Sequence, residues 1–168
     1  KENKEKTHNY YLHLAISPTK NTNRFEWFLE KATEIGIDEI TPIISEKSEK
    51  ETIKKERCNK ILISAMKQSN QYYLPILNDP ITLKEFLQKK YTCQKYIAHC
   101  NSDISRSELK SEKSLNKSII LIGPEGDFTI NEIQVALNKN YKSISLGSNR
   151  LRTETAAILA TGIINIKN

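Results

Sequence analysis

The chain has 168 residues, a length that suits a single domain with a buried core and leaves little room for a second complete domain. Hydrophobic residues make up 38% of the sequence and charged residues 27%, a balance that argues against wholesale disorder. The formal net charge of +6, with 26 Lys and Arg, fits an anionic partner, but a lysine-rich solvated surface explains the charge equally well.

The first two expected elements are a strand and an amphipathic helix. Residues 10–16 are β-prone and partly alternating, so we expect a strand there. Residues 23–36 place apolar side chains at helical spacing, which predicts a helix. Asn23 and Glu26 are its expected N-terminal cap, and Gly36 stands just past its end.

Strands and helices continue to alternate through the middle of the chain. Residues 39–45 form a short apolar run that predicts a strand, and residues 56–71 repeat the helical pattern. Thr82 and Glu85 fit a capping box that opens a third helix. The next buried strand is expected over residues 95–100.

A polar segment then separates this part from the last third of the chain. Residues 101–118 have few apolar positions and many Ser and Lys, which indicates a mobile loop. Residues 119–123 predict a strand. A second capping box, formed by Thr129 and Glu132, opens a helix over residues 129–140.

The chain ends with a strand over residues 142–147, a loop over 148–152 and a helix over 153–165. This last helix is apolar around most of its circumference, so it must be buried on more than one side. It either threads through its own domain or forms a subunit interface. The alternation of elements predicts an α/β fold, in which a mostly parallel sheet carries helices on both faces.

The cysteines and the hydropathy pattern indicate the redox compartment of the protein and argue against a metal site or a membrane span. Cys58, Cys93 and Cys100 form an odd set without the spacing of a disulfide scaffold or a zinc site, which favours a reducing cytoplasm and predicts no metal. No apolar run approaches the roughly 20 residues that cross a bilayer, so we expect no membrane partner.

Two loops are candidates for ligand binding, residues 123–127 (GPEGD) and 146–154 (LGSNRLRTE), because each follows an expected strand. Three of the five glycines in the chain lie in them. Glycine lets main-chain donors approach a ligand closely, although each glycine alone is explained by a tight turn. A GxGxxG sequence and a GK[ST] loop are both absent, which argues against hydride transfer and nucleotide hydrolysis.

Four sequence blocks carry a resemblance to a known family: RFEWFLEKATEIGIDEITPIIS, KILISAMKQS, IGPEGDFTINEI and LGSNRLRTETAAI. In this order they resemble the signatures of the RsmE-type 16S rRNA uridine-N3 methyltransferases, members of the SPOUT (α/β-knot) superfamily. The resemblance implies a C-terminal trefoil knot, a homodimer formed through the terminal helix region, and S-adenosylmethionine as cofactor. It also implies 16S rRNA or the small ribosomal subunit as partner.

The resemblance also implies a domain division and a set of cofactor-binding residues. Residues 10–168 would form the SPOUT methyltransferase domain, and residues 1–9 a linker or the tail of a missing N-terminal PUA-like domain. His99, which a strand-end position explains equally well, would contact the cofactor together with Cys100 in a third loop. The full cofactor-binding set is His99, Ile122, Gly123, Pro124, Glu125, Gly126, Leu146, Gly147, Ser148, Leu151, Arg152, Thr153 and Ala156.

Methylation at uridine N3 requires a group that accepts the N3 proton or stabilises the N3 anion. Glu154 is a candidate for the first role, and Arg150 or Arg152 for the second. The alternatives are that Glu154 interacts with the dipole of the last helix, and that the arginines pair with a carboxylate or contact RNA.

Departures from the family pattern leave other functions open. Asp127 stands where the family often has glycine, and Lys67, Gln68 and Gln71 replace an expected Glu-Gln pair and arginine. The alternative functions are a knotted methyltransferase acting on another RNA, such as tRNA, and a non-catalytic RNA-binding module.

Overall fold

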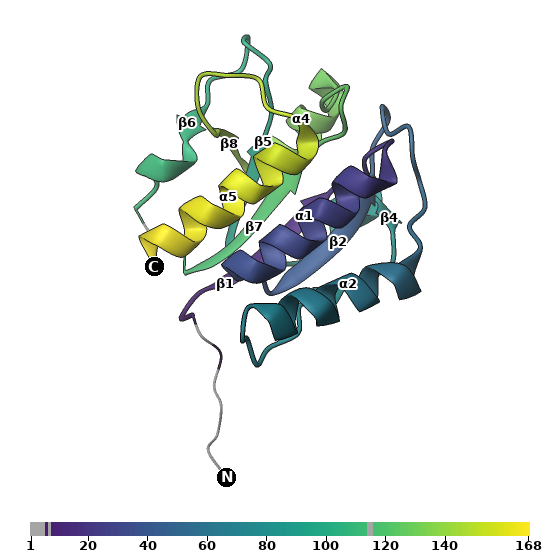
Figure 1. Ribbon diagram of the computed structural model, residues 1–168. Coiled ribbons are helices and arrows are strands. Elements are labelled where there is room, and N and C mark those ends of the chain that lie inside the picture. The colour runs from purple at the N-terminus through teal and green to yellow at the C-terminus, as the bar shows by residue number, and fades with distance from the viewer. Residues whose placement is uncertain (1–5, 7, 114–115) are drawn as a thin grey trace.

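The alternating strands and helices of the sequence form a parallel sheet between two layers of helices (Figure 1). The computed structural model describes residue 6, residues 8–113 and residues 116–168. In chain order the elements are β1 (Tyr11–Ile16), α1 (Thr22–Ile35), β2 (Glu39–Ile44), α2 (Lys55–Gln68), β3 (Ile76–Leu77), β4 (Ile81–Thr82), α3 (Leu83–Gln88), β5 (Gln94–Ala98), β6 (Ser107–Glu108), the 3-10 turn η1 (Leu109–Ser111), β7 (Lys117–Ile122), α4 (Ile130–Asn138), β8 (Lys142–Ser145) and α5 (Thr153–Lys167).

Every strand pair in the sheet is parallel. The strand order is β3-β2-β1-β7-β5-β8-β6, and β4 also pairs with β2. Because the strands are parallel, the loops that follow β1, β5, β7 and β8 all leave the same edge of the sheet. The predicted α/β fold with a mostly parallel sheet is therefore confirmed, while the trefoil knot stays a prediction.

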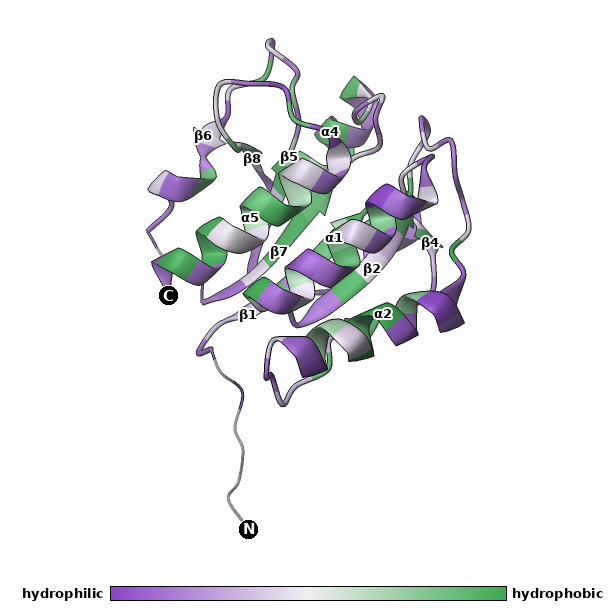
Figure 2. Cartoon of the chain, viewed as in Figure 1, coloured by the Kyte–Doolittle hydropathy of each residue, from purple (hydrophilic) through white to green (hydrophobic). Residues whose placement is uncertain are grey.

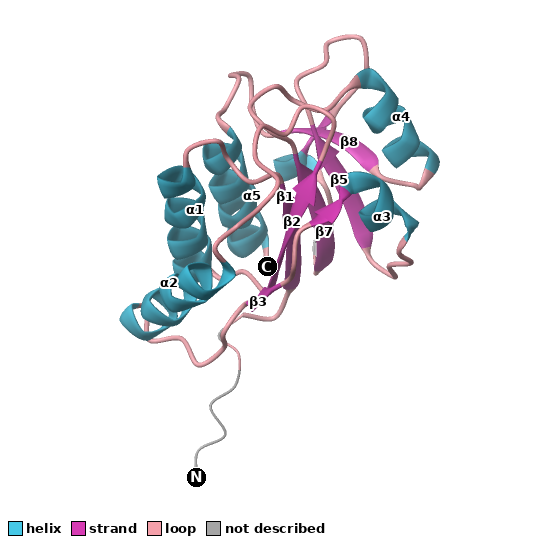
Figure 3. Ribbon diagram, turned by 90° about the vertical axis from the view of Figure 1, so that its right-hand side faces the viewer, coloured by secondary structure: helices cyan, strands magenta, loops and turns pink. Residues whose placement is uncertain are grey.

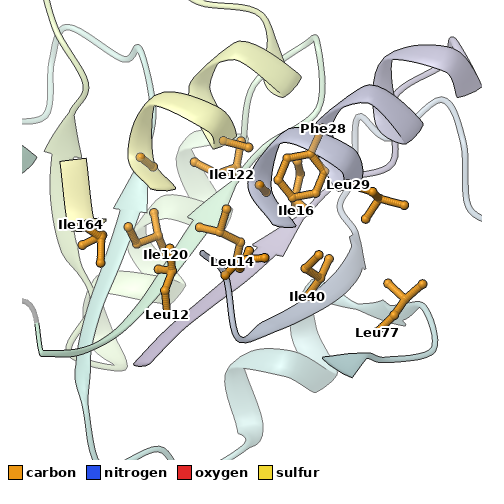
Figure 4. Close-up of a cluster of buried hydrophobic side chains, with 14 of the residues drawn as sticks. Leu12, Leu14, Ile16, Phe28, Leu29, Ile40, Leu77, Ile120, Ile122 and Ile164 are labelled. Carbon is orange, nitrogen blue, oxygen red and sulfur yellow. The ribbon is translucent and has the colours of Figure 1, made fainter. Parts of the chain in front are cut away.

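Helices α1, α2 and α5 cover one face of the sheet and α3 and α4 the other (Figure 3). Side chains of the strands alternate between two cores, one on each face. On one face, Leu14 and Ile16 of β1 pack in the same core as Phe28 of α1 and residues of α5 (Figure 4). On the other face, Ala15 joins the core that contains Phe86 of α3. Each fully buried large side chain of this kind contributes about 1.5–3 kcal/mol. The prediction of helices on both faces is confirmed.

The ends of α1 differ in part from the sequence prediction. The N-cap is Asn21, whose side chain accepts a hydrogen bond from the backbone N–H of Asn23 (3.0 Å), so Asn23 already lies inside the helix. The predicted cap of Asn23 with Glu26 is wrong, and Glu26 instead pairs with Arg57 (2.6 Å). Gly36 ends the helix at φ 117°, as predicted.

Both predicted capping boxes are present. In α3, Thr82 and Glu85 exchange hydrogen bonds between each side chain and the other residue's backbone N–H, and Thr129 and Glu132 do the same in α4. The Glu132 carboxylate also accepts the N–H of Glu46 (2.8 Å). The start of α4 is therefore tied to the loop that follows β2.

The segment 101–118, predicted to be a mobile loop, contains regular structure. β6 pairs with β8, and Leu109 in η1 is fully buried in the core beside α5. The last two residues of the segment, Lys117 and Ser118, belong to β7. Residues 114–115 lie outside the described part. The prediction is wrong for residues 107–111 and 117–118. One buried leucine and a two-residue strand leave no periodic signal in the sequence.

Helix α5 is buried on one side only. Ala157, Ala160 and Ile164 pack in the core, whereas Leu159 is 38% exposed and Ile166 is 85% exposed. Figure 2 shows hydrophobic colour along much of this helix. Within the described residues, no helix has the length and apolar character needed to cross a membrane. The exposed apolar face of α5 favours the subunit-interface interpretation of the sequence.

The docking of η1 gives a first testable expectation. We expect Leu109→Ala to lower the free energy of unfolding by about 2–5 kcal/mol, because it removes a fully buried side chain from the core. Urea unfolding measures this change, and Lys113→Ala, at an exposed position of the same segment, serves as the control. Equal stability of the two variants would contradict the docking of this segment.

Candidate functional site

Loops that follow β5, β7 and β8 enclose a cavity of about 300 Å³ together with the first turn of α5. Its lining residues are Ala98, His99, Cys100, Arg106, Gly123, Pro124, Glu125, Asp127, Ile144, Ser145, Leu146, Gly147, Asn149, Arg150, Leu151, Arg152, Thr153 and Ala156. The cavity lies at the carboxyl ends of the strands, the edge at which parallel α/β sheets bind ligands. Its volume is at the lower end of the range for small-molecule sites.

The lining combines aliphatic side chains with three arginines. Its aliphatic residues include Ala98, Pro124, Ile144, Leu146, Leu151 and Ala156, and its arginines are Arg106, Arg150 and Arg152. Aliphatic surfaces bind flat apolar rings, and guanidinium groups bind carboxylates and phosphates. The cavity is therefore suited to a ligand that has both an apolar ring and an anionic group.

Gly123 is required by the close packing behind the cavity. A Cβ atom at this position would lie 3.1 Å from the ring of Phe128 and 3.2 Å from its backbone nitrogen. The Gly123 carbonyl accepts a hydrogen bond from the Thr153 hydroxyl (3.0 Å), which joins the end of β7 to the start of α5. Gly147 has φ 139°, a backbone conformation that side-chain-bearing residues rarely adopt.

His99 is a buried wall residue with two hydrogen bonds. Its Nδ1 accepts the backbone N–H of Asn101 (3.2 Å), so Nε2 carries the proton and donates to the Ser143 hydroxyl (2.9 Å). Burial lowers the pKa of His99 below its usual value, and the nearby Arg106 acts in the same direction. His99 is thus a buried residue at the end of a strand and also part of the cavity lining, so both interpretations of it agree with the geometry.

Asp127 links two of the loops. Its Oδ2 accepts the N–H of Cys100 (2.8 Å), and its Oδ1 accepts the N–H of Phe128 (2.8 Å). The Asp127 N–H donates to the Pro124 carbonyl (2.9 Å), and Asp127 itself has φ 62°. The turn therefore forms without the glycine that relatives often have here, because aspartate tolerates this left-handed conformation.

Arg106 is a site residue that the sequence analysis missed. Its Nη1 donates to the His99 carbonyl (2.6 Å), which places the guanidinium in the cavity wall. The segment that carries it was predicted to be a loop, and no motif marks it. Only the pairing of β6 with β8 brings this arginine to the site.

Most of the residues singled out in the sequence meet at this cavity. Those that line it are His99, Cys100, Gly123, Pro124, Glu125, Leu146, Gly147, Arg150, Leu151, Arg152, Thr153 and Ala156. Three others do not line it: Ile122 is buried within β7, while Gly126 and Ser148 are exposed outside the lining. The lining residues that the sequence did not indicate as ligand contacts are Ala98, Arg106, Asp127, Ile144, Ser145 and Asn149.

Glu154 lies beside the cavity rather than in its lining. It is 5% exposed in the first turn of α5, and its Oε1 is 3.7 Å from Nε of Arg24. A carboxylate at a helix N-terminus is stabilised by the helix dipole, which agrees with the structural alternative for this residue. No group of three or more His, Cys, Asp or Glu in the described part of the chain is arranged to hold a metal ion.

Comparison with known proteins gives consistent matches over nearly the whole chain. The family model described as "RNA methyltransferase domain" matches residues 6–165. Ribosomal RNA small subunit methyltransferase E of Rickettsia conorii is 38% identical over 158 residues, which is 92% of this chain. The chain spans 64% of the length of that relative.

Solved structures agree with the sequence matches. A probable rRNA-methyltransferase from Porphyromonas gingivalis superposes with a TM-score of 0.91 at 38% identity, over 97% of this chain and 70% of that one. The ribosomal RNA small subunit methyltransferase E of Neisseria gonorrhoeae, solved bound to S-adenosyl methionine, has a TM-score of 0.81 at 30% identity. That match covers 90% of this chain and 64% of the other.

The link made by Asp127 can be tested by hydrogen exchange. We expect Asp127→Gly to accelerate exchange of the Cys100 amide by about tenfold or more, because a hydrogen bond to a charged group contributes about 1.5–3 kcal/mol. Asp127→Asn, which keeps an acceptor oxygen and tolerates the same φ, should accelerate it less. Unchanged exchange in Asp127→Gly would show that the carboxylate does not hold the two loops together.

Proposed function

The chain belongs to the RNA methyltransferase domain family, and on that basis we propose that it transfers a methyl group from S-adenosylmethionine to N3 of a uridine in 16S ribosomal RNA. The observation that carries this proposal is the cavity formed by the loops after β5, β7 and β8. Relatives named ribosomal RNA small subunit methyltransferase E support the substrate. We further propose that the reaction takes place in the cytoplasm, on the RNA or the small ribosomal subunit.

The residues of the cavity fit S-adenosylmethionine. Leu146, Leu151 and Ile144 supply aliphatic surface for the adenine ring, and the close packing behind Gly123 leaves room only for backbone at the base of the site. Arg152 supplies a positive charge for the carboxylate of the methionine part. When bound, this cofactor supplies a methyl group on a positively charged sulfur.

For this reaction the protein must align the methyl group with N3 and stabilise the charge that develops during transfer. Arg150 and Arg152 lie on the cavity wall, where their guanidinium groups stabilise negative charge on the uracil or hold RNA phosphate. Three other basic residues already pair with protein groups: Lys20 with Glu49, Lys47 with the Gly126 carbonyl, and Arg24 with Glu154. The arginines of the cavity are therefore the better candidates for contact with the target nucleotide.

We also propose that the protein forms a homodimer through the exposed face of α5. Leu159 and Ile166 leave apolar surface on a helix whose other side is already packed. A twofold axis beside α5 would bury the same side chains from both copies. Since α5 begins at Thr153 in the cavity wall, such an interface would lie next to the site.

Cofactor binding is the first test of the proposed function. We expect saturable binding of S-adenosylmethionine by calorimetry, and we expect Gly123→Val to abolish it, because the added carbon atoms collide with Phe128 and displace the loop. Val135→Ala, at an exposed position on α4 outside the lining, is the control. Circular dichroism shows whether each variant is folded. A folded wild-type chain without affinity for the cofactor would leave only a non-catalytic RNA-binding role.

The product of the reaction defines the target within the same test. Nucleoside mass spectrometry of unmodified 16S rRNA incubated with the protein should detect N3-methyluridine with the wild type and none with Gly123→Val. Methylation on a ribose, or methylation of tRNA alone, would contradict the proposed substrate while leaving the methyltransferase activity in place.

The dimer proposal is tested by sedimentation. We expect Leu159→Asp to convert a dimer into monomers, because it places a charge in the apolar interface. Ile130→Asp introduces the same charge on α4, on the opposite face of the sheet, and should remain dimeric. A wild-type monomer at micromolar concentration would disprove the proposed assembly.

A further inference from the structure

Buried oxygen atoms without hydrogen-bond partners are concentrated at one edge of the sheet. Among the described residues, five buried side-chain oxygens lack a partner, and three of them lie at this edge: Ser17 Oγ, Glu125 Oε2 and Glu154 Oε2. The other two belong to Asp38 and Tyr141. Ser17 directly follows β1 and donates its backbone N–H to the Ile122 carbonyl at the end of β7 (3.0 Å). Glu125 stands three residues further along, and Glu154 lies in the first turn of α5. Buried acceptors of this kind call for a functional explanation, because none of them has a donor from the protein.

Glu125 is the member of this group that lines the cavity. Its two carboxylate oxygens differ: Oε1 accepts the backbone N–H of Lys20 (3.0 Å), whereas Oε2 has no donor. One oxygen is therefore anchored to the loop after β1, and the other is buried without a donor from the protein. Nη2 of Arg150 lies 3.5 Å from the backbone carbonyl oxygen of Glu125, so a guanidinium contacts the main chain of the same residue.

We propose that the Glu125 carboxylate accepts the N3 proton of the target uracil and thereby selects uracil over cytosine. This inference rests on the proposed function. Uracil presents an N3–H donor between two carbonyl acceptors, whereas N3 of cytosine carries a lone pair. An ionised carboxylate is only an acceptor, so it binds the first pattern and repels the second. The Arg150 guanidinium supplies a donor for one of the flanking carbonyl oxygens.

The proton and electron balance of the step is complete. The N3 proton passes to Glu125, and the N3 electron pair forms the bond to the methyl carbon. The bond between that carbon and sulfur breaks, and its electron pair stays on sulfur, which becomes a neutral thioether. No other reactant is required.

Glu154 is less suited to this role than Glu125. It does not line the cavity, and its Oε1 already lies 3.7 Å from Arg24. Glu154 instead borders the site at the start of α5, where the helix dipole stabilises its charge.

The test compares Glu125→Gln with Glu154→Gln and with Glu49→Gln, a control at an exposed carboxylate that pairs with the Lys20 side chain. Single-turnover methylation of unmodified 16S rRNA is measured from neutral to alkaline pH, alongside calorimetry with S-adenosylhomocysteine. We expect Glu125→Gln to retain saturable binding of S-adenosylhomocysteine but, with the cofactor saturating, to methylate about 100-fold more slowly at neutral pH, the usual scale for a lost general base. Its rate should recover as alkali ionises uracil N3, and Glu49→Gln should match the wild type.

The outcomes separate this proposal from the proposed function. A wild-type rate in Glu125→Gln, or loss with alkaline recovery in Glu154→Gln alone, would overturn the role of Glu125. Failure of the wild type to bind S-adenosylhomocysteine would instead contradict the proposed function. If the chain binds S-adenosylhomocysteine but does not methylate isolated RNA, NMR titration of that complex decides: uridine should bind more tightly than cytidine or N3-methyluridine, and Glu125→Gln should remove the preference. Equal affinities in the wild type would overturn the proposal.

Discussion

The parallel pairing of β7 with two neighbours at once is the constraint on which the rest of the structure depends. All six residues of β7 are paired with β1, and five of them are also paired with β5. This places Gly123 beside Ser17 on one flank and near His99 on the other. Segments more than 20 residues apart in the sequence thus reach a common edge, and the cavity exists only because they do. Loss of this register would separate the loops even if each kept its own conformation.

Close packing behind the cavity turns this arrangement into a rigid site. Phe128 fills the space next to Gly123, and the hydroxyl of Thr153 holds the Gly123 carbonyl. Asp127 has a left-handed backbone conformation, and its carboxylate accepts hydrogen bonds from two backbone N–H groups. One of these, the N–H of Cys100, belongs to the loop after β5. Backbone atoms and short side chains therefore form the base of the cavity. The arginines that line it have long, flexible side chains, which can adjust to a ligand. Such a division suits a site that must hold one small molecule firmly and receive a much larger one.

Local signals in the sequence predicted the elements well, since periodicity and capping depend on neighbouring residues. Both capping boxes, the Gly36 helix end and the two loops that line the cavity were visible in this way. Features set by distant residues were not visible. Arg106 reaches the cavity only through pairing of a two-residue strand, and Leu109 is buried by α5 from the far end of the chain. The choice of Asn21 over Asn23 as cap shows the same limit on a smaller scale, because both residues satisfy the local rule.

The charge arrangement at this edge explains how one cavity can meet two opposed requirements. In the proposed reaction, a positively charged sulfonium and an acidic N3–H would both favour a nearby carboxylate, whereas the developing charge on uracil and the RNA phosphates would favour arginine. Arg106, Arg150 and Arg152 line the cavity, and Glu125 lies among them with one oxygen anchored and one free. Anchoring by a backbone N–H from another loop fixes the carboxylate without using an arginine for the purpose. The guanidinium groups therefore stay available for the nucleotide, and the acceptor stays available for its proton.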